Sequence, residues 1–191
     1  MKRIPLTQGK EALVSDCDYK YLMQWKWCYA KVKNGGYALR RGPSPERKSI
    51  YMHNVVAKRM NLTGSPDHRK QGSRDNGINN QRNNLRPATR SQNQGNVGLQ
   101  SRNSSGYRGV HGHKKNCRWI PHIRITGKSR HLGCYPLTRS GKIEAAYAYN
   151  IAALKWFGKC ALLNPVRQLL SDKTKRQIKR DVLQRLESFG L

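Results

Sequence analysis

The distribution of apolar and polar positions along the chain predicts short strands in its first third. Runs that are rich in β-branched and aromatic residues alternate there with turn-forming residues, which is typical of an antiparallel sheet. The runs occupy positions 11–14, 25–32, 37–40 and 49–53, and a helix is predicted over 54–60. Residues 1–62 are therefore expected to form a small β-rich subdomain.

The most regular pattern lies between positions 107 and 164. Alternating residues predict strands over 107–110, 118–125 and 129–135, and apolar residues at spacings of three and four predict a helix over 141–157. The small residues of that helix would let it pack closely on the sheet. A final helix is predicted over 171–189, with Ser171 as its N-cap and one apolar stripe, which is formed by Ile178, Val182, Leu183 and Leu186. The fold class expected is α+β.

Residues 63–106 contain almost no large apolar side chains and many asparagines. Composition alone predicts a disordered linker for this stretch, because such a segment buries too little apolar surface to offset the entropy of ordering. That interpretation changes when the segment is searched for residues that carry chemistry.

The charge of the chain indicates a polyanionic partner. The formal net charge is +28 over 191 residues, which favours the phosphate backbone of double-stranded DNA. A membrane surface is the weaker alternative, because we find no apolar run of spanning length, no signal-peptide pattern and no lipidation motif. The five cysteines are odd in number and lack a C-x-x-C pair, so free thiols in a reducing cytoplasm are expected.

Asp67 and His68 are the candidates for catalysis. Only two acidic residues, Asp67 and Asp75, lie between Glu46 and Glu144. Phosphodiester hydrolysis needs an activated water and a cation near the phosphate. A neutral imidazole can accept the proton of that water, and a carboxylate oxygen suits Mg²⁺ or Mn²⁺. His68 is therefore predicted as general base and Asp67 as metal ligand, and a bend is expected between them because adjacent strand residues face opposite sides.

The amide oxygen of Asn93 is the second predicted ligand for Mg²⁺ or Mn²⁺, since both ions prefer hard oxygen donors. A short helix over 83–93 would carry this residue at its far end. Asp75 is expected to form a turn.

The same stretch resembles the HNH endonucleases of phage and intron-borne homing enzymes. The resemblance covers about thirty residues and is carried by Pro66-Asp67-His68, by the run from Asn76 to Arg86 and by the run from Ala88 to Asn93. It implies a ββα-metal module over 63–102, in which Asn84 is the middle residue of the motif and fixes the loop to the helix.

Residues 103–164 resemble the DNA-binding domain of plant ethylene-response factors, the APETALA type. The resemblance spans nearly sixty residues and is carried by the motifs Gly106-Tyr107-Arg108-Gly109-Val110, Arg118-Trp119, Leu132-Gly133-Cys134-Tyr135 and Glu144-Ala145-Ala146-Tyr147. It implies a three-stranded sheet that lies in the major groove with a helix behind it. Combined with strand alternation, it predicts the DNA-facing residues Arg108, His111, Arg118, His122, Arg124, Arg130 and His131, and assigns Trp119 to packing.

His53 and the histidines from His111 onward each have two possible interpretations. His53 is expected to be a packed, hydrogen-bonded structural residue, with a role at the phosphate as the alternative. The cysteines and histidines between His111 and Cys134 suggest a zinc site, but their spacing fits no common zinc finger, so no zinc is expected.

The sequence thus predicts four parts: 1–62, the nuclease module 63–102, the DNA-binding domain 103–164, and a basic amphipathic helix in 165–191. The favoured function is a metal-dependent, site-preferring DNA endonuclease of the homing type. We expect it to act as a monomer on DNA without an obligate protein partner, in the cytoplasm of a bacterial host if a phage encodes it. The alternative is a non-catalytic DNA-binding regulator with a relic HNH segment.

Overall fold

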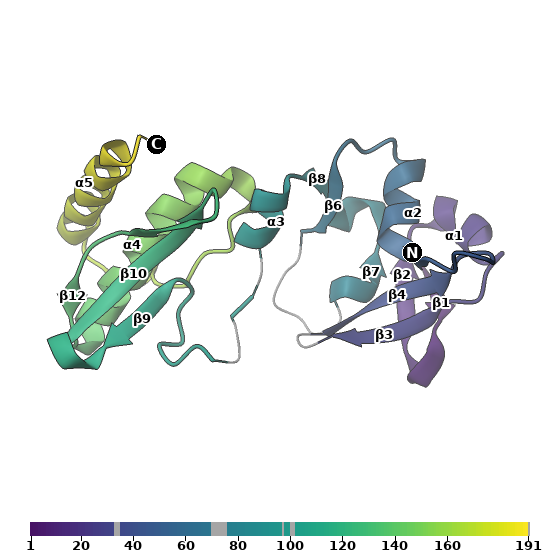
Figure 1. Ribbon diagram of the computed structural model, residues 1–191, viewed down its shortest axis with the longest axis horizontal. Helices are drawn as coiled ribbons and strands as arrows, with labels where there is room; N and C mark the ends of the chain where they lie inside the picture. The colour runs from purple at the N-terminus through teal and green to yellow at the C-terminus, as the bar shows by residue number, and fades with distance from the viewer. Residues whose placement is uncertain (33–34, 70–75, 97, 100–101, 191) are drawn as a thin grey trace. The chain divides into compact units, whose positions relative to one another are not determined.

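The computed structural model describes residues 1–32, 35–69, 76–96, 98–99 and 102–190, and Asp75 lies outside them. The chain forms two compact units, Met1–Arg90 and Ser91–Leu191. The fold is a mixed α+β arrangement with several small, mainly antiparallel sheets and a C-terminal helix (Figure 1). The boundary between the units falls inside the stretch 63–102 that the sequence assigns to a single module.

The described residues of the first unit form three small sheets and two α-helices. The strands pair in the orders β1-β2-β7, β3-β4-β5 and β6-β8, and all of these pairs are antiparallel except β2-β7. The strands are β1 (Lys2–Pro5), β2 (Glu11–Val14), β3 (Cys28–Val32), β4 (Gly35–Arg41), β5 (Ser49–Tyr51), β6 (Ser65–His68), β7 (Asn79–Asn80) and β8 (Leu85–Ala88). The helices are α1 (Asp16–Leu22) and α2 (Met52–Arg59).

The predicted strands of residues 1–62 and the helix after them are confirmed, whereas β1 and α1 were not predicted. Both are short, and each depends on distant partners. In α1 the fully buried Asp18 carboxylate accepts hydrogen bonds from Arg59 and from Arg82. Burial raises the pKa of Asp18, but the two guanidiniums lower it more, so that the pKa lies below its ordinary value. A paired buried carboxylate of this kind joins three segments that are far apart in sequence.

The second unit is built on one sheet. β9 (Val110–His113) pairs with the first half of β10 (Arg118–Ile125). β11 (Lys128–His131) pairs with its second half, and β12 (Tyr135–Pro136) pairs with its first two residues. The antiparallel order of the predicted meander is confirmed, with its last strand divided into β11 and β12. Its first strand begins at Val110 and runs to His113, so the strand predicted over 107–110 is shifted by three residues.

Two long helices cover one face of this sheet. α4 (Arg139–Phe157) lies along it and α5 (Asp172–Ser188) packs against α4 (Figure 1). Five alanines of α4 are fully buried, which permits the close approach that the sequence predicted; they are Ala145, Ala146, Ala148, Ala152 and Ala153. The Ser171 side chain accepts a hydrogen bond from Thr174 N, which confirms it as the N-cap of α5. No helix in the described parts of the chain is long and apolar enough to cross a membrane.

The prediction of a helix over 83–93 is wrong. Leu85–Ala88 is strand β8, paired with β6, and the helix that follows is α3 (Arg90–Gly95). Pro87 explains the difference: it has no N–H for a helical hydrogen bond, and it disfavours helical dihedrals at the residue before it.

Candidate active site and nucleic-acid-facing sheet

The two-stranded sheet of β6 and β8 positions the two predicted catalytic residues of the first unit. Asp67 lies opposite Arg86 and His68 lies opposite Leu85 in an uninterrupted antiparallel ladder. The bend expected between Asp67 and His68 is absent from this ladder. Because neighbouring strand residues face opposite sides, the two side chains have different partners.

Asp67 forms a buried ion pair. The Nε and Nη2 atoms of Arg86 donate to Asp67 Oδ2 at 2.9 and 2.7 Å, and the Asp67 side chain is only 6 % exposed. Such a pair holds the carboxylate in one place. A carboxylate oxygen suits a divalent metal ion, but this one already has a cationic partner.

His68 is held by Asn80. The distance from His68 Nε2 to Asn80 Oδ1 is 3.4 Å, and the ring is 6 % exposed. The Asn80 amide nitrogen donates to Ile78 O at 3.2 Å, which directs the amide oxygen at the imidazole. Nε2 therefore carries the proton of the neutral ring, and Nδ1 is its basic nitrogen.

Burial lowers the pKa of His68 below its ordinary value, and the bond to Asn80 and the charge of Asp67 oppose this shift only in part. His68 is consequently neutral at neutral pH, as a general base must be.

Asn84 has a structural position near this pair. Its amide nitrogen donates to Asn79 O at 2.8 Å, which closes the turn between β7 and β8. This contact gives a side-chain-to-backbone brace of the kind expected for Asn84. Asn93 lies half-buried in α3 and belongs to the second unit.

A second imidazole lies beside His68. The His53 and His68 rings are 5.2 Å apart between centroids, and Tyr37 contacts both rings. His53 Nδ1 is buried and has no hydrogen-bond partner among the described residues, so the packing expected for His53 is present but the hydrogen bond at this nitrogen is not. Burial, with a smaller effect of His68, lowers the pKa of His53 to about 4.

The exposed face of the second unit's sheet gathers most of the predicted DNA-facing residues. Arg118 and Arg124 are exposed on β10, whereas Ile123 and Ile125 between and beside them are buried. The pairing register places the histidines on that same exposed face; they are His111, His122 and His131. His111 Nδ1 and His122 Nδ1 are 3.1 Å apart. Burial, together with His111 and His131, lowers the pKa of His122 below its ordinary value.

Arg130 and Arg108 lie elsewhere. Arg130 pairs with Ile123 on the helix-covered face, and its guanidinium carbon lies 4.9 Å from the centre of the Phe189 ring. Arg108 precedes the sheet, and its Nη2 donates to Gly95 O at 2.9 Å and to Tyr149 OH at 3.2 Å. Trp119 packs as predicted and donates from Nε1 to Thr138 O.

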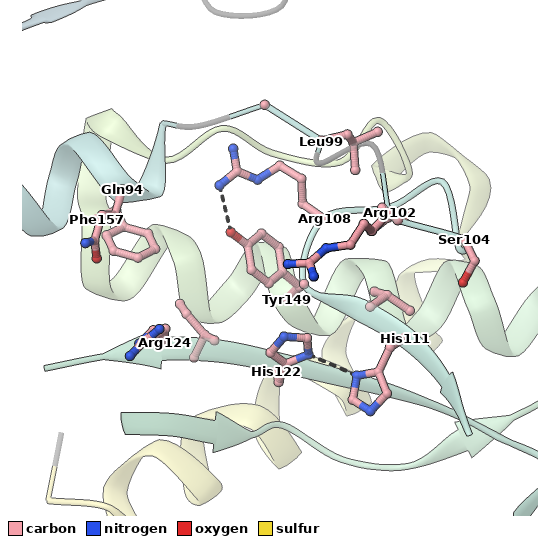
Figure 2. A pocket seen from close by; sticks show the side chains of 15 residues that line it. Gln94, Leu99, Arg102, Ser104, Arg108, His111, His122, Arg124, Tyr149 and Phe157 are labelled. Atoms are coloured by element: carbon pink, nitrogen blue, oxygen red, sulfur yellow. Dashed lines mark hydrogen bonds between the residues drawn. The ribbon is translucent and has the colours of Figure 1, made fainter. Parts of the chain in front are cut away.

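A cavity of about 530 Å³ opens beside the second half of β10. Figure 2 shows Arg102, Arg108 and Tyr149 close together above the strand, with His122 and Arg124 on the strand below them. The cavity belongs entirely to the second unit.

Comparisons with protein-family models, with curated proteins and with solved structures give no match for this chain.

Metal binding has a limited basis in the described residues. Among them, no group of three or more His, Cys, Asp or Glu side chains is arranged to hold a metal ion. Mg²⁺, however, commonly uses one or two carboxylates and completes its shell with waters and substrate phosphate. The donor set at Asp67 fits that chemistry to the extent that one carboxylate is held in place by Arg86 on the paired strands β6 and β8.

Sequence reasoning missed three residues of the site: Asn80, Arg86 and Tyr37. Asn80 and Arg86 lie within the HNH-like run, but their contacts depend on the pairing of β6 with β8 and on the position of β7. No local pattern carries that information. The one sequence signal for Asn80 is the doubled Asn79-Asn80, which places two further amide side chains in the same run as Asn84.

Proposed function

We propose that this protein is a DNA endonuclease of the HNH type, in which His68 activates the attacking water. The observation that carries the proposal is the orientation of His68, a neutral imidazole on β6 whose Nε2 faces Asn80 Oδ1, one residue after the ion-paired Asp67. The charge of +28 supports a nucleic acid as the substrate.

The chemistry assigned to the chain's own residues is a proton transfer. His68 Nδ1 takes a proton from water, the water oxygen bonds to phosphorus, and the bond from phosphorus to the leaving oxygen breaks as that oxygen gains a proton from solvent. Asn80 holds the tautomer that leaves Nδ1 basic, and Asn84 braces the turn next to it. Mg²⁺ or Mn²⁺ held by Asp67 would stabilise the charge that develops on the phosphoryl oxygens. Asn93 stays the second ligand predicted from the sequence.

DNA binding is assigned to the exposed sheet of the second unit. A ribbon of strands fits the major groove of B-form DNA, and an exposed Arg can donate two hydrogen bonds to guanine. Arg118, Arg124 and the three histidines of that face are suited to this role, in line with the resemblance to the APETALA-type domain. Because the narrow major groove of A-form RNA excludes such a sheet, DNA is the favoured substrate.

A specific observation favours the alternative, a DNA-binding regulator without catalysis. Asp67 already has a counter-charge in Arg86, and both Asp67 and His68 are only 6 % exposed. The uninterrupted ladder also turns their side chains to opposite sides of β6, without the bend that would bring both to one phosphate. In a relic module, the ion pair of Asp67 with Arg86 would only stabilise the pairing of β6 with β8. The two functions differ in one measurable property, which is the breakage of a phosphodiester bond.

The test is a nicking assay on supercoiled plasmid that carries the genomic sequence flanking the gene, with and without Mg²⁺. Wild type should convert the plasmid to nicked or linear product only with the metal. His68→Ala should lose at least about a hundredfold in rate and keep its DNA affinity in a gel-shift assay. His113→Ala, a histidine outside the site, is the control. Equal rates for wild type and His68→Ala would exclude the assignment, and absence of any cleavage with intact DNA binding would favour the regulator.

A further inference from the structure

The cavity in the second unit lies beside the sheet, where the pairing of β9 with β10 ends. On the side of β9, the last backbone hydrogen bond to β10 runs from His122 N to Gly109 O at 2.7 Å. Beyond it Ile123 and Arg124 pair with β11 on one side and line the cavity on the side of β9. Tyr149 and Phe157 of α4 form one wall, and Leu99 and Arg102 line another side (Figure 2).

The wall of the cavity carries an excess of positive charge. Three arginines and two histidines line it, and none of the described lining residues is acidic; the basic residues are Arg102, Arg108, Arg124, His111 and His122. A guanidinium presents planar pairs of N–H donors that match phosphate oxygens. The ligand class that this wall favours is therefore a phosphate-bearing anion.

Two of the three arginines are held in place by the protein. Arg108 donates from Nη2 to Gly95 O and to Tyr149 OH, and Arg124 Nε donates to Gly127 O at 3.1 Å. Arg102 is exposed, and its side chain makes no hydrogen bond or ion pair with a described residue. Arg102 is consequently the arginine whose donors can turn to a ligand at least cost.

The aromatic wall is fixed by close packing against glycines. A Cβ atom at Gly95 would overlap the Phe157 ring, and one at Gly109 would overlap the Tyr149 ring. Leu99, which is 47 % exposed, adds apolar surface at the rim. Rigid aromatic surface beside phosphate-binding groups suits a nucleotide, since a base or sugar can pack on the rings while the phosphate meets the arginines.

We propose that this cavity binds a single nucleotide unit, with its phosphate at Arg102 and Arg108 and its nucleoside against Tyr149 and Phe157. A volume of about 530 Å³ lies within the range of small-molecule sites, roughly 300 to 1,000 Å³. The proposal rests on the proposed function, because DNA is the source of nucleotides that the charge of the chain favours. The nucleotide is either part of a DNA strand or free in solution.

The experiment measures binding to the full chain without Mg²⁺, so that a failure of cleavage leaves the result unaffected. The probes are thymidine 5′-monophosphate, thymidine, inorganic phosphate and duplex DNA, titrated by calorimetry at low salt. Arg102→Gln removes the exposed cation of the cavity. Arg176→Gln removes an arginine of α5 that is also exposed and lies outside the cavity, and it is the matched control.

If the cavity binds a free nucleotide, thymidine 5′-monophosphate should bind saturably. Arg102→Gln should weaken that binding on the order of tenfold, and Arg176→Gln should leave it unchanged. A DNA strand as the source predicts no binding of the monophosphate. In that case Arg102→Gln should lower the slope of duplex affinity against salt by about one phosphate contact, and Arg176→Gln should not.

Tyr149→Phe gives an independent check, because it removes the hydroxyl that holds Arg108 while keeping the ring. It should weaken the same probe as Arg102→Gln. The proposal is overturned if Arg102→Gln and Arg176→Gln behave alike with every probe, or if thymidine binds as tightly as its monophosphate. Binding of inorganic phosphate alone, with the same dependence on Arg102, would support the phosphate position and remove the nucleoside contact from the proposal.

Discussion

Asp67 and His68 are neighbours in the chain, but each is held by a different partner. Arg86 holds the carboxylate and Asn80 holds the imidazole. Burial lowers the pKa of His68 by more than the charge of Asp67 raises it. The imidazole therefore stays neutral although a carboxylate is its neighbour in the chain. The chemistry of the proposed site therefore depends on Asn80 and Arg86 as much as on the two residues they hold.

Asn80→Ala tests whether Asn80 positions the base. The bond from Asn80 raises the pKa of His68, so its loss should lower that pKa further and move the acidic limb of the cleavage-rate profile to lower pH. The rate on the plateau should fall by about ten- to a hundredfold because the tautomer is no longer fixed.

Single-turnover cleavage across pH with saturating Mg²⁺ is the measurement for this variant. Asn79→Ala is the control, because its side chain accepts only from Gln81 N among the contacts described. A variant that is slower but keeps the wild-type pH profile would assign Asn80 a structural role only.

The two buried histidines should make stability depend on pH. The pKa of His53 is about 4 in the folded chain and near 6.5 in an unfolded one. The unfolded chain thus binds more protons between these values, and stability falls as the pH falls through that window. The loss from His53 between pH 7 and pH 5 should be about 2 kcal/mol.

Urea unfolding of wild type and His53→Phe at both pH values measures this contribution. The variant should lose less stability on acidification, and His68, His122 and His131, whose pKa values are also lowered, should contribute in the same direction. An equal loss in both proteins would show that His53 does not carry the effect.

At the scale of elements, strand β10 has one face in the core and one exposed face. Its odd-numbered positions from Pro121 to Ile125 are buried, while Arg118 and Arg124 are exposed at even-numbered ones. The same alternation places Arg130 of β11 over Phe189, away from His122 and His131. Strand period therefore decides which basic residues share a surface.

Arg124→Ala should relax sequence preference at one or two base pairs. Its Nε is bound to Gly127 O, which leaves the terminal nitrogens to donate to a guanine, a contact worth roughly 1 to 3 kcal/mol of discrimination. Lys175→Ala on α5, whose ammonium group pairs with Asp172, should weaken all sequences equally or not at all. Binding-site selection measures both, and an unchanged motif for Arg124→Ala would rule out base reading by this residue.

At the scale of the molecule, the chain consists of two compact units with separate cores. The second unit includes α3, because Trp156 Nε1 donates to Ser91 Oγ and Gly95 packs on Phe157. A DNA-binding fragment should therefore begin at Ser91, not near Asn103 where the sequence pattern begins.

A fragment of residues 91–191 should fold and bind duplex DNA without cutting it. If it neutralises about six to ten phosphates, its affinity should fall by about three to five decades from low to moderately high salt. A fragment that begins at Asn103 should be less stable, because it lacks the Ser91 and Gly95 contacts. Gel-shift titrations in a salt series, with circular dichroism for folding, are the measurements. Retained DNA binding by residues 1–90 alone would reverse this division of labour.

Local pattern was sufficient for the elements whose signals lie within one segment. The strand 118–125, the helix along 141–157 and the N-cap at Ser171 follow from periodicity and capping chemistry, which neighbouring residues determine. Tertiary structure decided the rest. Leu85–Ala88 is a strand because Pro87 opposes a helix and β6 supplies the hydrogen bonds. Strand pairing and packing between distant segments also decide three contacts that spacing along the chain does not encode. They are the contacts of Asp67 with Arg86, of His68 with Asn80, and of Asp18 with two arginines.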